Sequence, residues 1–521
     1  MEINIHSQTR DGMLLNNKNQ RINIVQYYTT RKIMRHLFFL ILLPLLFSCS
    51  VSRNYNPNKK YSKAQLQQDY ILLRNILEKK HPALYWYTSK DSMDYYFDRG
   101  YKAISDSMTE LQFGWKILAP LTSTIHCGHT SFSMSKGWNH FIKNKIIPSF
   151  PLFLKVWKDS MMVIADLNRK DTLIKNGDFI TAINGIKTAD MINYMFHFLV
   201  EDGYSENVNY IRLSANFPYF HRNIFGLYKN YQVDYTDSNG VANSVRLPWF
   251  SPEPDTVKKI KKELRQKKRK ITHYEKLQNI RSLEFDSSFA LMTVNGFSNG
   301  HLRNFFRRSF RIMRKNKTKN LVIDIRANGG GDIIKSAFLT RFLRDKPFKV
   351  ADSAYSVSKN LRPYTKYIST GFLNNLGLTF VTHKKKDGKY HFGYWENHTF
   401  MPKRKNHFDG EIYVLINGIT FSASTLFCND VKGQSNIKLV GEETGGGWYG
   451  NSGIMIPNIT LPNTKLRVRL PFFKLVQYHH ISFKGTGVMP DIYIGPNWRD
   501  ILNGKDTKLE RVEEIINKST P

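Results

Sequence analysis

One serine stands where a side chain could act as a nucleophile. Ser422 lies in the stretch "INGITFSASTLFCNDVKG" (416–433), shortly after an apolar run over 412–416. The run predicts a buried strand, and the residues from Ala423 onward have helical spacing. A side chain between the carboxyl end of such a strand and a helix faces the edge where α/β proteins bind ligands. The same position also suits an ordinary helix N-cap, because serine is a preferred capping residue.

A glycine-rich loop offers a second chemical element. Asn328, Gly329, Gly330 and Gly331 follow a second apolar strand pattern, "NLVIDI". Neither GxGxxG nor the Gly-Lys-Ser/Thr ending of a phosphate loop is present, which argues against a nucleotide site. The backbone N–H groups of the loop could instead bind a negatively charged oxygen. A tight strand-to-helix turn explains one glycine easily and three less well.

A hydroxyl nucleophile needs a base, and two pairs of histidines are available for that role. His126 and His129 lie in "LTSTIHCGHTSF", and His479 and His480 lie in "VQYHHISF". The spacing of the first pair is also compatible with a metal, but no third ligand cluster such as HExxH follows. We therefore expect no metal and no cofactor.

Composition describes a well-packed globular chain with a large positive charge. The chain has 521 residues, enough for two or three domains, with 41% hydrophobic and 13% aromatic residues and a formal charge of +35. Lys and Arg are scattered, with one dense run over 258–270 that lacks interleaved aromatics. We interpret this run as a solvated linker or helix face and do not expect a nucleic-acid partner, although attraction to an anionic membrane surface stays open.

A targeting segment precedes the globular part. Arg35 is followed by an apolar core over 37–47, too short for a permanent membrane span but right for a secretory signal. The core ends in "LFSC", which resembles a bacterial lipoprotein cleavage box and implies lipidation of Cys49. The protein would then be anchored in the bacterial cell envelope, facing the periplasm. Cys127 and Cys428 remain, and two buried free thiols are favoured over a single bridge.

The periodicities predict an α/β protein of several domains. Helical spacing dominates the first part, a hairpin pattern closes at Asn239-Gly240, and strands alternate with helices in the last part. The phrase "GDFITAING" resembles the core signature of a PDZ domain, which captures chain ends by strand addition. The expected order is an extension with signal peptide (1–49), a tether (50–60), a helical bundle with the candidate base (61–145), a PDZ-like α+β domain (150–250), a basic linker (251–283), an α/β core with mostly parallel strands (284–497) and a helical tail (498–521).

Four pieces together resemble one family of peptidases. "GHTSF", "GDFITAING", "VIDIRANGGG" and "TFSAS…GEETGGG…GTGVMPDIYIG" occur in the order and spacing of the C-terminal-processing (tail-specific) serine peptidases and their tricorn-core relatives, over residues 61 to 497. The resemblance implies a crotonase/ClpP-like core in which Ser422 is the nucleophile. It also implies oxyanion donors at the N–H of Ala423 and in the loop of Gly329 and Gly330.

The chain departs from that family at two positions. The tail-specific lysine position is occupied by Gly447, so the tricorn-like branch is favoured, whose histidine falls on His129. The glutamate that this branch carries near "GVMPD" is absent, which leaves the group that orients the histidine unassigned. The sequence thus predicts a serine endopeptidase acting on unfolded or tail-exposed polypeptides at the cell envelope. The alternative is an inactive relative that binds a peptide or an apolar ligand.

Overall fold

The computed structural model describes residues 55–143, 145–168, 173–252, 272–369, 377, 380–479 and 485–519. The predictions for Cys49, for the basic run 258–270 and for His480 fall outside these residues. The chain divides into two compact units, one of residues 1–56 and 136–141 and one of residues 57–135 and 142–521. Among the described residues, no helix combines the length and the apolar character that a membrane crossing requires.

In the described part of the smaller unit, aromatic rings pack together. The ring of Tyr55 lies 6.4 Å from that of Trp138 and 5.7 Å from that of Phe141, both on helix α6 (Lys136–Ile142). All further features belong to the larger unit.

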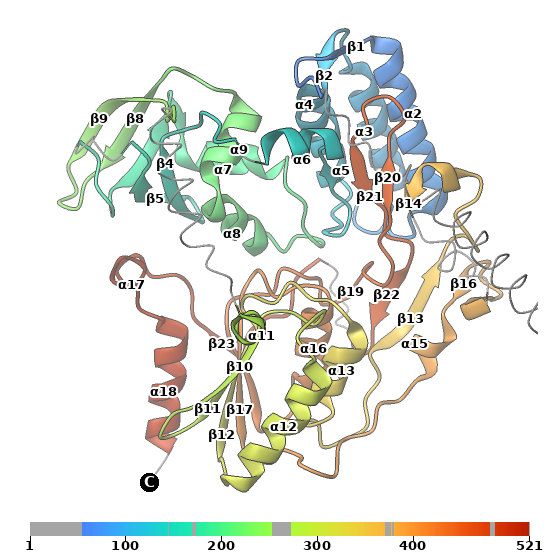
Figure 1. Cartoon of the computed structure of the whole chain (residues 1–521), viewed down its shortest axis with the longest axis vertical. Coiled ribbons are helices and arrows are strands. Elements are labelled where there is room, and N and C mark those ends of the chain that lie inside the picture. Colours follow the sequence, from blue (N-terminus) through green and yellow to red (C-terminus); the bar gives the residue numbers. More distant parts are fainter. Residues whose placement is uncertain are drawn as a thin grey trace, which may run out of the picture. The chain divides into compact units, whose positions relative to one another are not determined.

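A six-stranded sheet, referred to below as the central sheet, lies in the lower part of Figure 1. Its first pairing is antiparallel and the other four are parallel. The expected mixed α/β architecture with parallel strands is thereby confirmed. In spatial order the strands are β10 (Arg281–Phe285), β11 (Ala290–Val294), β12 (Asn320–Asp324), β17 (Glu411–Ile416), β18 (Ile437–Gly441) and β23 (Ile492–Tyr493).

Helices cover both faces of this sheet, which explains the uninterrupted apolar run of β17. Ile412 and Val414 pack toward one face, which is covered by α12 (Leu302–Lys315), α13 (Ile333–Thr340) and α16 (Ala423–Val431). Tyr413 packs toward the other face, against α18 (Thr507–Ser519). Figure 1 shows α18 on the opposite side of the strands from α12 and α13. Because side chains of a strand alternate between faces, a strand covered twice must be apolar at every position.

The sheet begins earlier in the chain than the sequence predicts. Residues 251–283 were expected to be linker. Helix α11 (His273–Gln278) lies within this range, and the first strand, β10, begins inside it at Arg281. Thr272 caps α11 through a capping box with Glu275, a local signal that the surrounding basic residues obscure.

A second sheet is built from residues 152–248 and has its own apolar core. The expected hairpin at Asn239-Gly240 is confirmed, since β8 and β9 pair antiparallel over seven residues each. The strands are β4 (Leu152–Trp157), β5 (Ser160–Asp166), β6 (Phe179–Ile183), β7 (Ile186–Lys187), β8 (Asn230–Thr236) and β9 (Ala242–Pro248), and the helices are α7 (Thr188–Phe196), α8 (Asn207–Ala215) and α9 (Phe217–Phe225).

The N-terminal part of the larger unit is helical, as its spacing predicts. Ser62 and Thr109 each begin a helix with a capping box. The elements are β1 (Lys60–Tyr61), α2 (Lys63–Lys80), α3 (Lys90–Lys102), β2 (Met108–Thr109), α4 (Glu110–Phe113), the π-helical turn η1 (Gly114–Leu118) and α5 (Ala119–Ser123).

Two smaller sheets complete the described part of the larger unit, and one of them joins the N-terminal part to the C-terminal half of the chain. The short strand β3 (Phe132–Ser133) pairs with β21, so the residues just after His129 are fixed to the C-terminal half of the chain. One sheet is β14 (Ile368–Ser369), β20 (Asn458–Thr460), β21 (Arg467–Arg469) and β3; the other is β15 (His383–Lys384), β16 (Tyr390–His391), β13 (Ala351–Ser356), β22 (Lys474–Gln477) and β19 (Gly450–Asn451). The remaining elements are η2 (Tyr364–Lys366), α15 (Gly393–Asn397) and α17 (Trp498–Asn503).

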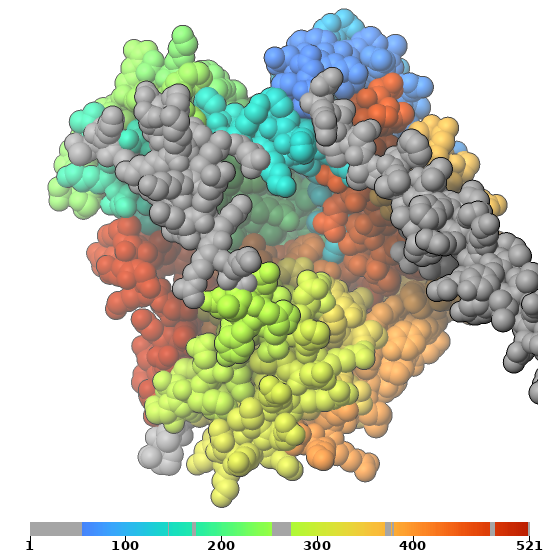
Figure 2. Space-filling model, viewed as in Figure 1, coloured from blue at the N-terminus to red at the C-terminus, as the bar shows by residue number. Residues whose placement is uncertain are grey.

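Helix α12 carries a strongly basic outer face. Its buried side is aromatic, and it contains no acidic residue. The surface of this region faces the reader, in yellow-green, in Figure 2. Its exposed basic residues are Arg303, Arg307, Arg308, Arg311, Arg314 and Lys315.

A buried carboxylate joins helix α2 to the turn between β20 and β21. Asp69 is fully buried and accepts hydrogen bonds from the N–H groups of Asn463 (2.9 Å) and Thr464 (2.8 Å). It also accepts from the side chains of the same two residues, at 3.0 and 2.7 Å. Because buried N–H groups without an acceptor are costly, this one side chain stabilises a contact between distant parts of the chain.

Replacing this carboxylate should therefore destabilise the fold. We expect Asp69→Asn to lower the free energy of unfolding by about 3 kcal/mol. The NH₂ group of the new amide would face the N–H groups from which the carboxylate now accepts hydrogen bonds, so these donors would lose an acceptor. Urea titration followed by tryptophan fluorescence measures the change. The matched control is Asp352→Asn on the exposed side of β13, which should change stability by less than about 0.5 kcal/mol. Equal effects from both variants would contradict the role of Asp69.

Candidate active site

Ser422 is held in an unusual backbone conformation at the start of α16. It occupies the N-cap position with φ 57° and ψ −121°, and its side chain makes no capping hydrogen bond. A positive φ costs a non-glycine residue roughly 1–3 kcal/mol and persists where the surroundings impose it. The hydroxyl oxygen instead lies 3.1 Å from Nε2 of His129, a residue 293 positions away in the chain. The structure thus excludes the simple capping interpretation and pairs the hydroxyl with an imidazole.

Residues without side chains surround this hydroxyl. A Cβ on Gly330 would lie 2.7 Å from that of Ser422, and one on Gly446 would lie 3.0 Å from the Ser422 nitrogen. A Cβ on Gly453 would lie 2.9 Å from Ser422 Oγ and 3.0 Å from His129 Nε2. The close approach of the two side chains therefore depends on glycine at these positions. Sequence reasoning singled out Gly330 but not Gly453.

His129 is buried in an environment that keeps its ring neutral. Only 3% of its surface is exposed, and the ring of Phe421 lies 4.8 Å away, centre to centre. Burial, helped by the positive charge of Arg469, lowers the pKa of His129 to about 3. A neutral imidazole has one nitrogen free to accept a proton, as a general base must.

Asp202 faces the other nitrogen of that ring. Its Oδ1 lies 4.0 Å from Nδ1 of His129, which has no hydrogen-bond partner. The carboxylate accepts the N–H of Gly128 at 2.7 Å and that of Gly447 at 3.4 Å. Burial raises the pKa of Asp202 to about 7, against the lowering effect of those two N–H groups. Asp202 is therefore the carboxylate that lies beside Nδ1 of His129, where the sequence left no group assigned.

No local sequence pattern marks Asp202 as part of the site. It lies in the loop between α7 and α8, within the stretch 150–250 that resembles a peptide-binding module. Its contact with His129 joins residues far apart in sequence. The next residue, Gly203, has φ 64°, and a Cβ there would lie 2.5 Å from the Cα of Gly485. The loop therefore requires glycine at this position, but a single glycine in the sequence does not point to the site.

The other candidate bases are occupied or lie elsewhere. His126 Nδ1 contacts Glu201 at 2.9 Å, and Glu201 also accepts from Asn209 at 2.7 Å. The ring of His479 packs on Tyr478, 4.4 Å between centres. Of the predicted histidines that the structure describes, it is His129 that meets the serine.

The three backbone N–H groups predicted to bind the oxyanion differ in whether they already have a hydrogen-bond acceptor. Ala423 is the first residue of α16, so its N–H has no intrahelical acceptor, and the helix terminus favours negative charge there. The N–H of Gly330 donates to Asn328 Oδ1 at 3.0 Å in this conformation, so its predicted use as an oxyanion donor would require that hydrogen bond to open. Gly330 contributes through its missing side chain instead. Gly329 is exposed and has open space around its Cα, so it stays available as the second donor.

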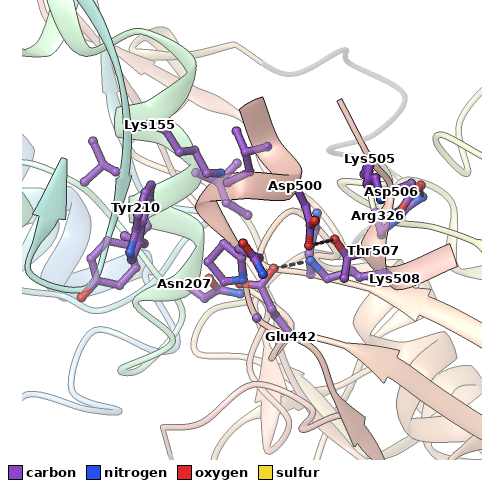
Figure 3. A pocket seen from close by; sticks show the side chains of 18 of the residues that line it. Lys155, Asn207, Tyr210, Arg326, Glu442, Asp500, Lys505, Asp506, Thr507 and Lys508 are labelled. Carbon is purple, nitrogen blue, oxygen red and sulfur yellow. Dashed lines mark hydrogen bonds and ion pairs between the residues drawn. The ribbon is translucent and has the colours of Figure 1, made fainter. Parts of the chain in front are cut away.

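A large cavity lies apart from this pair of residues. Its volume is about 840 Å³, and it opens between β4 and α8 on one side and the chain from Tyr493 to Lys508 on the other. Figure 3 shows Lys155 from the second sheet and the ion pair of Lys508 with Glu442, 2.7 Å apart, on its wall. Neither Ser422 nor His129 lines it. The chemistry of the site thus does not take place in this cavity.

Comparison with known proteins relates the residues of the central sheet to one family of peptidases. Residues 288–494 match the family model described as Peptidase family S41. The crystal structure of mature CPAF has a TM-score of 0.59 and 15% sequence identity, covering 88% of this chain and 99% of that one. Mature CPAF complexed with lactacystin gives a TM-score of 0.57 and 15% identity, covering 87% and 98%. No curated protein matches the chain.

The match and the site fall on the same elements. The family segment contains β11, β12, β17, α16 and β18, which carry or support Ser422 and the glycine loop. At 15% identity the solved structures show a shared fold. The resemblance drawn from the sequence motifs is confirmed: residues 288–494 match the model of peptidase family S41, and the chain shares its fold with the solved structure of mature CPAF.

Proposed function

We propose that this protein is a serine peptidase in which Ser422 is the nucleophile and His129 is the general base. The observation that carries the proposal is the 3.1 Å contact between Ser422 Oγ and His129 Nε2. A buried neutral histidine next to a hydroxyl at a helix N-terminus is the arrangement that acyl transfer requires. The family match supports hydrolase chemistry of this class.

The first half of the reaction forms an acyl-enzyme. His129 Nε2 takes the hydroxyl proton as Ser422 Oγ attacks the peptide carbonyl. The carbonyl oxygen becomes negatively charged and is stabilised by the N–H groups of Ala423 and Gly329. The C–N bond then breaks, and the protonated imidazole gives its proton to the departing amine.

The second half repeats these steps with water. His129 removes a proton from water, which attacks the ester carbon of the acyl-enzyme, and the proton then returns to Ser422 as the bond breaks. In both halves the imidazole carries a positive charge for a moment. An ionised Asp202, 4.0 Å from Nδ1, stabilises that charge.

Substrate class and location follow from features outside the reacting atoms. The second sheet, residues 152–248, is PDZ-like and binds the end of an unfolded or tail-exposed polypeptide by strand addition. Lipidated Cys49 anchors the protein in the bacterial envelope on the periplasmic side, ahead of the helical domain that carries the base. The basic face of α12 supports attraction to an anionic membrane surface.

One observation favours an inactive, ligand-binding relative. Asp202 lies 4.0 Å from His129 Nδ1, beyond hydrogen-bond distance, so the ring is not held by a direct bond. Catalytic hydrogen bonds are often long before substrate binds, so this distance fits an unliganded peptidase as well. Reaction with a serine-directed probe separates the two functions.

The serine itself is tested by covalent labelling. A fluorophosphonate should label the protein at Ser422, and Ser422→Ala should reduce labelling and peptide hydrolysis by at least about 10³-fold because the nucleophile is lost. In-gel fluorescence and peptide mass mapping measure the result. Ser424→Ala, two residues further into the same helix, is the control and should keep the label. A folded wild-type protein that never reacts would indicate the ligand-binding relative.

The glycine that flanks both reacting atoms provides a steric test. Gly453→Ala should reduce the labelling rate by about 10²-fold, because the new Cβ would lie 2.9 Å from Ser422 Oγ and displace it. Gly393→Ala is the control, since its Cβ would meet no atom closer than 3.5 Å. Circular dichroism of both variants verifies that they fold. Normal labelling of Gly453→Ala would contradict the geometry of the site.

Ionisation of Asp202 sets the expected pH dependence. With a raised pKa of about 7, its carboxyl is neutral below that pH and negative above it, whereas His129, with a pKa of about 3, stays neutral throughout. The second-order labelling rate should therefore rise with pH around 7 and show no separate step near 6.5. In Asp202→Asn the rise should vanish, with a rate at pH 8 at least about tenfold below wild type. Glu411→Gln, an exposed carboxyl on β17, should behave like wild type.

A further inference from the structure

Three buried side chains of the types that bind zinc meet behind the reacting histidine. Cys127, His129 and Asp202 each offer one ligand atom, and these atoms lie within 4.8 Å of one another. All three residues are buried. The cluster lies on the Nδ1 side of the ring, opposite the Nε2 atom that contacts Ser422.

An unpartnered atom points into this cluster. His129 Nδ1 is buried and has no hydrogen-bond partner, although a nitrogen in that position normally has one. The nearest charged group is Asp202 at 4.0 Å, too far for a hydrogen bond but close to the separation of two ligands that share a metal. An ion between them would satisfy both atoms.

The geometry is near that of a tetrahedral zinc site. Zinc binds thiolate sulfur at about 2.3 Å and imidazole nitrogen or carboxylate oxygen at about 2.0–2.2 Å, which places its ligands roughly 3.5 Å apart. The three ligand atoms lie up to 4.8 Å apart, so they would have to move about 1 Å closer to one another to bind the same ion, which side-chain rotation can achieve. The hydroxyl of Ser452, 3.5 Å from Cys127 Sγ, or a water completes the fourth position.

The charges of this donor set balance those of the ion. Cys127 as thiolate and Asp202 as carboxylate carry two negative charges, which neutralise Zn²⁺ in a buried place where unpaired charge is costly. Binding releases the thiol proton to solvent. The backbone already holds the two loops together, because the N–H of Gly128 donates to Asp202 Oδ1 at 2.7 Å.

We propose that Cys127, His129 and Asp202 bind Zn²⁺ and that its binding switches the peptidase off. A metal on Nδ1 leaves the proton of the imidazole on Nε2, which can then donate to Ser422 but cannot accept its proton. The same ion takes the carboxylate that would stabilise the protonated ring. The inhibitory effect rests on the proposed peptidase function, whereas the binding site does not.

The sequence alone does not predict this site, because its three residues come from two segments that lie far apart in the chain. The two histidines spaced by three suggest a metal-binding pair, but His126 is engaged with Glu201. The cysteine between them and an aspartate from a distant loop supply the ligands instead, and only the folded chain brings these residues together.

Cobalt binding tests the site without reference to activity. Full-length protein, freed of metal with a chelator and kept reduced, is titrated with Co²⁺, whose tetrahedral thiolate complexes give visible ligand-field bands and a near-ultraviolet charge-transfer band. We expect one equivalent to bind with both signals and Zn²⁺ to displace it. Cys127→Ala should lose the charge-transfer band and bind Zn²⁺ at least about 10-fold more weakly. Cys428→Ala, which removes the other buried thiol, should behave like wild type.

Fluorophosphonate labelling tests the switch. Zn²⁺ should suppress labelling of the wild type and a chelator should restore it, while the labelling rate of Cys127→Ala should not differ with and without the same concentration of Zn²⁺. If Cys127→Ala does not fold, as judged by circular dichroism, Cys127→Ser replaces it. Absence of the charge-transfer band, or its persistence in the variant, would overturn the site. Metal binding with unchanged labelling would overturn the switch. A metal-free protein that binds cobalt but never labels would count against the peptidase function and leave the site standing.

Discussion

The contact between Ser422 Oγ and His129 Nε2 is the constraint around which the larger unit is organised. It joins residues 293 positions apart, so both side chains must be fixed independently before they can meet. On the serine side, the parallel strand β17 and the N-terminus of α16 set the backbone, including its positive φ. On the histidine side, β3 pairs with β21 and holds the chain that leaves His129. Neither arrangement would serve the contact without the other.

Burial gives the two polar groups behind that contact their properties. Removing water disfavours charge on both, so the pKa of His129 falls and that of Asp202 rises. Below pH 7 the resting pair is therefore close to uncharged, which spares the interior an isolated ion. Once a proton reaches the ring, an ionised carboxylate 4.0 Å away is worth of order 4 kcal/mol at an effective dielectric constant of 20. The same surroundings that keep the base neutral thus strengthen the attraction that follows proton transfer.

Local patterns in the sequence predicted the elements well and the pairing of distant loops poorly. The apolar run of β17, the helix after Ser422 and the hairpin at Asn239-Gly240 have short-range signals, and the structure contains all three. Ser422 and His129 were predicted because motifs surround them. Asp202 and Gly453 carry no such motif, since their roles arise only from contacts made in the folded chain. The hydrogen bond from the Gly330 N–H to the side chain of Asn328 also has no signal in the sequence, because it depends on the conformation of the folded loop.

The loop between α7 and α8 has a consequence for how the protein can be dissected. Asp202 belongs by sequence to the stretch that forms the second sheet, yet it lies against His129, and Tyr204 donates its N–H to the carbonyl of Gly485 at 2.7 Å. That stretch is consequently part of the wall of the reaction centre as well as a separate sheet. Excising it would remove the carboxylate that lies beside His129, so the chain cannot be cut there without altering the candidate active site.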